Sequence, residues 1–128
     1  MLDAVVIIAF FSPDNVHHAR AKNLIATAPG PFLMHSLTAA ETLVAAARQG
    51  RDAAMWAQMQ KLGVEMVQIG SGEPLLLAQL RATHGLKMPD TCVLAAATHR
   101  KVRLATFDEQ LGKVADTMSL RYTIPEVT

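Results

Sequence analysis

Four acidic residues of this 128-residue chain differ from the rest, because each lies beside an apolar run or at the start of a helical pattern. They are Asp3, Glu41, Asp90 and Asp108. Asp3 directly precedes eight consecutive apolar residues, and burying a charge without a partner is costly. Six of the other acids lie in turns, near element ends or at the chain end, where solvation explains them: Asp14, Asp52, Glu65, Glu73, Asp116 and Glu126.

Short β-like runs alternate with helical patterns along the whole chain, without a repeat, a low-complexity tract or a linker. The β-like runs cover 2–6, 32–36, 64–69, 102–106 and 120–124; the helical patterns cover 15–27, 37–49, 52–62, 73–83, 90–100 and 108–114. The run after Asp3 is ambiguous, since it also fits a strand that turns directly into a short buried helix. The alternation predicts βαβ units and a mostly parallel sheet with helices on both faces.

In such a fold the C-terminal ends of the strands and the N-terminal ends of the following helices share one edge, where ligands bind. Asp3 lies at or near the end of the first strand, and Asp108 follows the strand over 102–106. Asp90 opens a helix after Pro89, and Glu41 lies in the first turn or so of another. Helical spacing turns Asp90 towards the core. All four acids are therefore expected at one edge of the sheet.

Each acid also has a purely structural interpretation. Asp90 and Asp108 favour the positive end of a helix dipole, and Asp3 fits an N-cap for the segment that follows. Thr38 and Glu41 have the spacing of a capping box, and Glu109 completes another with Thr106. Taken singly, these alternatives stay open.

Clustered carboxylates repel one another. Two of them about 4.5 Å apart, at an effective dielectric constant near 20, cost roughly 3–4 kcal/mol. Either some are protonated, with a raised pKa, or a divalent cation neutralises them. Oxygen ligands without Cys or His suit Mg²⁺ or Mn²⁺.

Other chemistries find little support in the residues. A single cysteine, Cys92, excludes an internal disulfide and fits a reducing cytoplasm. No metal-spaced histidine pair occurs; His35, at a strand end, is the histidine that could line the site. A net charge of +1 neither demands nor excludes a nucleic-acid partner, and neither a membrane helix nor a signal peptide is expected.

Four blocks of the sequence resemble the signature blocks of PIN-domain ribonucleases, most closely the VapC toxins of bacterial toxin–antitoxin pairs. They are "LDAVVIIAFFSPDNVHHARA", "TAAETLV", "GLKMPDTCVLAAA" and "LATFDEQL", in the family's order and spacing. The resemblance implies one three-layer α/β/α domain over residues 1–128, with a central mostly parallel sheet of four or five strands. It also implies a Mg²⁺- or Mn²⁺-dependent endoribonuclease that leaves a 5′-phosphate and a 3′-hydroxyl.

The resemblance extends to individual residues and partners. Asp3, Glu41, Asp90 and Asp108 match the family's acidic residues, and Thr106 matches the polar residue of its T-x-D element. The implied roles are catalysis and metal binding for the four acids and support for Thr106. The implied partners are RNA, a cognate antitoxin whose tail covers the acidic pocket, and a second copy of the chain in a homodimer.

One position departs from the family pattern. Val5 occupies a site that usually carries Ser, Thr or Asn, two residues after the first aspartate. A polar group there would help to orient the first carboxylate or a metal-bound water. The alternative hypothesis is therefore a catalytically weak or inactive PIN-like module that acts by binding its partner. A response-regulator receiver domain also gathers acids at a sheet edge, but "MLDAVV" lacks the paired acids it needs near the first strand.

Overall fold

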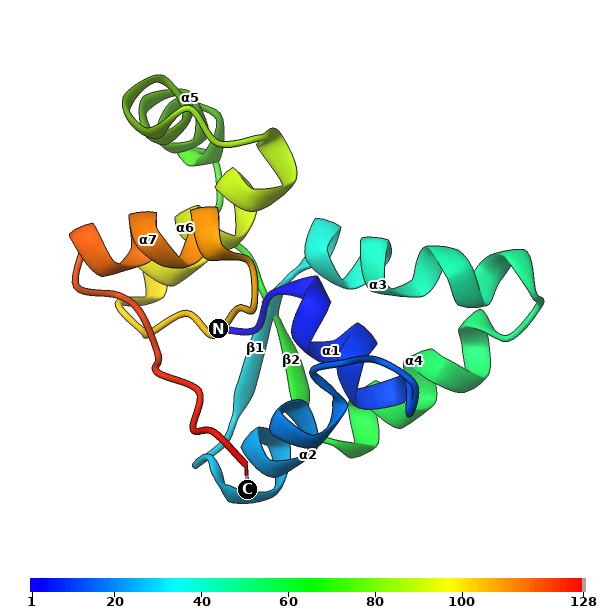
Figure 1. Ribbon diagram of the computed structural model, residues 1–128. Coiled ribbons are helices and arrows are strands. Elements are labelled where there is room, and N and C mark those ends of the chain that lie inside the picture. The colour runs from blue at the N-terminus through cyan, green and yellow to red at the C-terminus, as the bar shows by residue number, and fades with distance from the viewer. Residues whose placement is uncertain (128) are drawn as a thin grey trace.

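The computed structural model describes residues 1–127, which form seven helices around a small parallel sheet (Figure 1). The elements in chain order are α1 (Ala4–Phe11), α2 (His18–Thr27), β1 (Phe32–His35), α3 (Ser36–Arg48), α4 (Asp52–Lys61), β2 (Val64–Val67), α5 (Glu73–His84), α6 (Met88–Arg100) and α7 (Glu109–Thr117). Each predicted helical segment is present, with ends shifted by a few residues.

Within residues 1–127 the sheet has fewer regular strands than the sequence predicts, two in place of four or five. β1 and β2 are parallel, with Phe32 beside Val64 and His35 beside Val67. Beyond β1 the sheet continues through single bridges, first from Leu2 to Ala105 and then from Leu104 to Arg121. The backbone of Leu2 also donates a hydrogen bond to Leu33, at 2.8 Å. Five segments therefore lie side by side, as expected, but within residues 1–127 only two are long enough to be strands.

The predicted strand over 2–6 is wrong beyond its first residues. Only Leu2 forms a bridge, and α1 begins at Ala4 directly after Asp3. The apolar run forms a helix with one buried face. Val6, Ile7 and Ala9 on that face are inaccessible to solvent, whereas Val5 and Ile8 are partly exposed. The backbone N–H groups of this run bond within the helix and cannot extend the sheet.

Helices cover both faces of this sheet, which confirms the layered α/β arrangement. On one face α1 packs between α2 and α3, and on the other α6 packs against β1, α5 and α7 (Figure 1). α6 is buried from Thr91 to Ala97, so it is the central helix of its layer. Within residues 1–127, no helix has the length and apolar character needed to cross a membrane.

Candidate functional site

Asp3 and Thr106 form the buried centre of the candidate site. Asp3 is 5% exposed, and its Oδ1 accepts a hydrogen bond from the backbone N–H of Ala4 at 2.8 Å. The hydroxyl of Thr106 donates to Asp3 Oδ2 at 2.6 Å, and the Thr106 oxygen accepts the N–H of Asp108 at 3.0 Å. One hydroxyl therefore fixes the first carboxylate relative to the start of α7.

The pKa of Asp3 is raised to about 6. Burial is the largest cause, and hydrogen bonds from Thr106 and Ala4 oppose it; the negative charges of Asp90 and Asp108 raise the pKa further. Three of the four predicted carboxylates thus lie within electrostatic reach of one another.

Asp90 links this group to the fourth acid. It lies in the first turn of α6, where Pro89 occupies one of the first helical positions. Its side chain is half-buried, and its pKa is raised by burial and by Asp108, with Lys87 opposing. The pKa of Glu41, in the second turn of α3, is raised by partial burial and then by Asp90. The four acids therefore come from four elements to one edge.

Neither capping box that the sequence suggests is formed. α3 is capped by His35, whose Nδ1 accepts the N–H of Leu37 at 3.1 Å, so Thr38 lies inside the helix. The Thr38 hydroxyl is buried and has no hydrogen-bond partner among residues 1–127. Glu41 therefore does not cap the helix. Its side chain is exposed, and the negative charge of Asp90 is close enough to raise its pKa.

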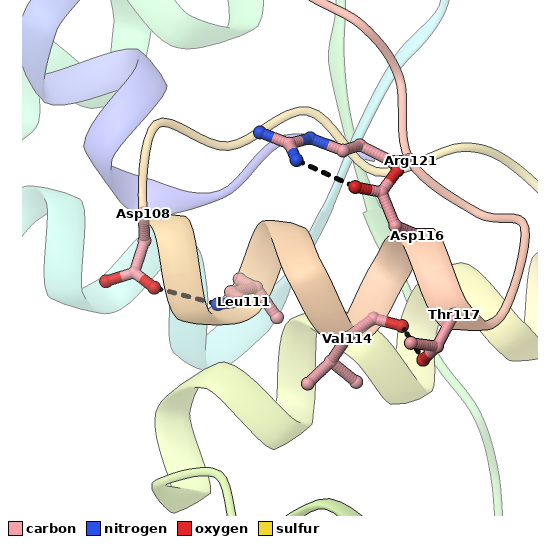
Figure 2. Close-up of polar contacts among 6 residues, drawn as sticks. All are labelled: Asp108, Leu111, Val114, Asp116, Thr117 and Arg121. Carbon is pink, nitrogen blue, oxygen red and sulfur yellow. Dashed lines mark hydrogen bonds and ion pairs between the residues drawn. The ribbon is translucent and has the colours of Figure 1, made fainter.

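The cap of α7 is Asp108. Its Oδ1 accepts the N–H of Leu111 at 2.8 Å, as Figure 2 shows at the start of the helix. The interpretation of Thr106 and Glu109 as a capping box is wrong, because the Thr106 oxygen accepts the N–H of Asp108 and the N-cap is Asp108 itself. Asp108 uses one carboxylate oxygen as the cap.

The donor set has the chemistry of a site for a hard cation: four carboxylates whose charges disfavour one another, without thiolate or imidazole. As the side chains are placed, no three acidic, His or Cys groups of residues 1–127 converge closely enough to hold a metal together. The side chains of Glu41 and Asp108 are exposed, so they can rotate without displacing core atoms.

A hydrogen bond between buried His35 and half-buried Glu73 was missed by sequence reasoning. His35 is 3% exposed, and its Nε2 lies 2.9 Å from Glu73 Oε1 at the start of α5. Since Nδ1 accepts from Leu37, Nε2 carries the proton and donates to the carboxylate. The thiol pKa of Cys92 is raised by burial and then by the charges of Glu73 and Glu41, which places this fifth acid near the same edge. The sequence placed Glu73 at the start of a helix, and we interpreted it there as a solvated acid.

Two cavities flank the acids. The first, of about 470 Å³, runs between α1, α3 and α4, and apolar side chains such as Ile8 and Phe11 line it together with polar ones that include Glu41 and Arg51. We call it the Glu41 groove. The second, of about 350 Å³, opens beside Thr106 and has a more polar wall, and we call it the Thr106 cavity.

Comparison with known proteins bears on the fold. The model of the PIN domain family matches residues 1–117. The crystal structure of VapC20 from Mycobacterium tuberculosis, a toxin that cleaves the sarcin–ricin loop, superposes with a TM-score of 0.78 at 15% identity, over 97% of this chain and 98% of that one. A toxin–antitoxin complex from Klebsiella pneumoniae gives 0.77 at 21% identity, over 98% of each chain. No curated protein sequence matches.

Proposed function

The chain belongs to the PIN domain family, and from that premise we propose that it is a Mg²⁺- or Mn²⁺-dependent endoribonuclease, the toxin of a toxin–antitoxin pair. The observation that carries the proposal is the buried carboxylate of Asp3, whose pKa is raised by burial and by two further acids. The burial of this charge and its closeness to two other negative charges are unfavourable in the ionised state, and a bound cation would relieve both. The similarity to two toxin structures supports the biological role.

The proposed metal ligands are Asp3, Asp90 and Asp108, with Glu41 either holding a second ion or accepting the proton of the attacking water. A bound Mg²⁺ or Mn²⁺ supplies a lowered water pKa and neutralises negative charge on the phosphate in the transition state. Thr106 holds Asp3 in one orientation through its 2.6 Å hydrogen bond. Exposed Glu41 is the acid whose side chain can reach a water beside the scissile phosphate.

The test is RNA cleavage by the purified chain, free of any antitoxin, with Mg²⁺, Mn²⁺ or EDTA. Cleavage is expected to require the metal and to fall by at least about a hundredfold in Asp90→Asn. The matched control is Glu65→Gln, which neutralises an exposed acid on β2 and is expected to cut as the wild type does. Unchanged cleavage in EDTA, or full activity of Asp90→Asn, would contradict the proposal.

A second candidate function rests on Val5. This residue lies in the first turn of α1, two positions after Asp3, and is 38% exposed, so a polar side chain would be accommodated there. An apolar group at this position gives no help in orienting the carboxylate. The alternative is a PIN-like module that binds a partner without cutting RNA. Wild-type protein that binds an antitoxin but cleaves nothing, with cleavage gained in Val5→Ser, would decide for it.

The partners that we propose are RNA, a cognate antitoxin and a second copy of the chain in a homodimer, and the proposed place of action is the cytoplasm. The Glu41 groove supports an antitoxin, because it combines apolar side chains with an acid, Glu41, and a base, Arg51, which a peptide segment with apolar and charged side chains would complement. The antitoxin should come from an adjacent reading frame and should abolish cleavage when co-purified. Sedimentation of the toxin alone tests the homodimer.

A further inference from the structure

The Thr106 cavity has a wall of rings and cations that the proposed chemistry does not use. His17, Arg20, Phe107, Arg121 and Tyr122 all line it, together with Thr106 itself. Thr106 bonds to the carboxylate of Asp3, so the cavity opens directly beside the proposed reaction centre. An endonuclease must hold the chain on at least one side of the bond that it cuts, and this cavity is adjacent to that bond.

Aromatic groups in the wall are fixed in place. The rings of His17 and Phe107 are stacked, with centroids 4.3 Å apart and planes within 6°. The guanidinium carbon of Arg20 lies 5.3 Å from the centroid of Phe107. Phe107 is therefore enclosed between His17 and Arg20, and the outer face of the His17 ring is the end of this stack on which an unpaired RNA base could continue it.

The two arginines of the wall differ in how much of their hydrogen-bonding capacity is used. Arg20 donates to the carbonyl of Ile124 at 2.7 Å and to that of Pro125 at 3.3 Å, and it pairs with Glu126 at 3.6 Å. It therefore ties the last segment of the chain to α2. Arg121 pairs through Nη1 alone with Asp116, at 2.9 Å, and within residues 1–127 its other N–H groups have no acceptor.

Gly112 determines where the free part of Arg121 lies. A Cβ at this position would be 2.9 Å from Cζ and 3.0 Å from Nη2 of Arg121, so the guanidinium packs on α7 where the helix has no side chain. Figure 2 shows the side chain running back along α7 from Asp116 towards the Asp108 end. A planar guanidinium held in this way, with Nη2 and Nε unused, matches the oxygens of a phosphate.

We propose that the Thr106 cavity binds a nucleotide of the RNA adjacent to the phosphodiester that is cut, with its phosphate on Arg121 and its base on the His17 end of the stack that His17 forms with Phe107. The inference rests on the proposed ribonuclease function. The wall also holds two acids: Asp116, which pairs with Arg121, and Glu109, in the first turn of α7, which repels phosphate from that end of the cavity. The exposed ion pair with Asp116 is screened by water and leaves the outer donors of Arg121 for the ligand.

Binding can be measured separately from cleavage. A fluorescein-labelled single-stranded RNA oligonucleotide is titrated with Asp90→Asn protein in EDTA and followed by anisotropy. In that background, Arg121→Gln and Gly112→Ala should each raise the Kd about fivefold. Arg121→Gln should also reduce the slope of log Kd against log salt concentration by about 0.7, the contribution of one phosphate contact.

Two controls keep the result interpretable. Lys113→Gln removes an exposed charge from the same helix outside the cavity wall, and its Kd should stay within about twofold of the parent value. Gly112→Ala moves the guanidinium without removing it, and Ala is the better helix former, so the fold should be retained. Equal Kd values for Arg121→Gln, Gly112→Ala and the parent protein would overturn the inference, as would an absence of RNA binding. If the two variants weaken RNA binding as expected but the wild-type protein does not cleave RNA, the inference stands and the proposed ribonuclease function is refuted.

Discussion

At the scale of single residues, the hydroxyl of Thr106 connects two of the acids, because it donates to Asp3 and accepts from the backbone of Asp108. Thr106→Val keeps the shape of the side chain but leaves a buried carboxylate oxygen and an N–H without partners. We expect the free energy of unfolding to fall by about 1–3 kcal/mol, measured by urea denaturation. Thr106→Ser keeps the hydroxyl and should lose less than half of that. Equal stability of the Val variant would show that water replaces the hydroxyl.

The raised pKa of Asp3 makes a prediction about pH. Its value of about 6 lies above the ordinary 3.8, so between these values the folded state holds the proton more tightly than the unfolded chain. Without metal, this carboxyl therefore stabilises the fold at about pH 4, and the contribution is lost as the pH rises through 6, with an upper limit of about 3 kcal/mol. The difference in unfolding free energy between wild type and Asp3→Asn, measured in EDTA, should change over this range and level off above about pH 7. A constant difference would mean that folding leaves the pKa of Asp3 unchanged.

The proximity of the four acids was predictable, because the parallel alternation of strands and helices brings them to one edge, whereas their roles in a functional site stay a prediction. Their hydrogen-bond partners were not predictable. Whether Asp108 or Thr106 caps α7 depends on where the Asp3 oxygen lies, 103 residues away. The pairing of His35 with Glu73 likewise depends on the placement of α5, which local spacing does not encode.

At the scale of elements, the cap of α7 allows the charge of Asp108 to be separated from its structural role. Asn is as good an N-cap as Asp, whereas Ala is not. Asp108→Asn should therefore unfold at nearly the wild-type urea concentration, while Asp108→Ala should lose about 1 kcal/mol. RNA cleavage should be impaired in both variants. An active, stable Asp108→Asn protein would assign this residue to the helix alone.

The first element was the hardest to predict. Eight apolar residues fit a buried strand and a buried helix equally well, and periodicity does not separate the two. The decision rests on Asp3, whose carboxylate accepts the N–H of Ala4 and starts a helix where the strand would have continued. Single bridges at Leu2 and Leu104 then replace the expected strands, because each of these segments pairs over too short a length.

At the scale of the whole molecule, a cation shared by four elements should stabilise the entire fold. With Mg²⁺ at about a hundredfold excess over its Kd, the gain is about 2.7 kcal/mol, and for a domain of this size the Tm should rise by roughly 10 °C. Differential scanning fluorimetry with and without Mg²⁺ measures the shift. Glu65→Gln should show the same shift as the wild type, and Asp90→Asn should show much less. Equal shifts in all three proteins would indicate nonspecific salt effects.

The central place of the first residues in the sheet has a consequence for synthesis. Leu2 lies between β1 and Ala105, and Asp3 accepts a hydrogen bond from the hydroxyl of Thr106. On the ribosome, the opening residues emerge long before the segment that they pair with has been translated. A nascent or prematurely terminated chain that stops ahead of that segment therefore lacks the sheet segments at Leu104–Ala105 and Arg121, together with Thr106 and Asp108, and we expect it to be inert. Under the toxin function proposed above, RNA cleavage would begin only when translation of the chain is nearly complete.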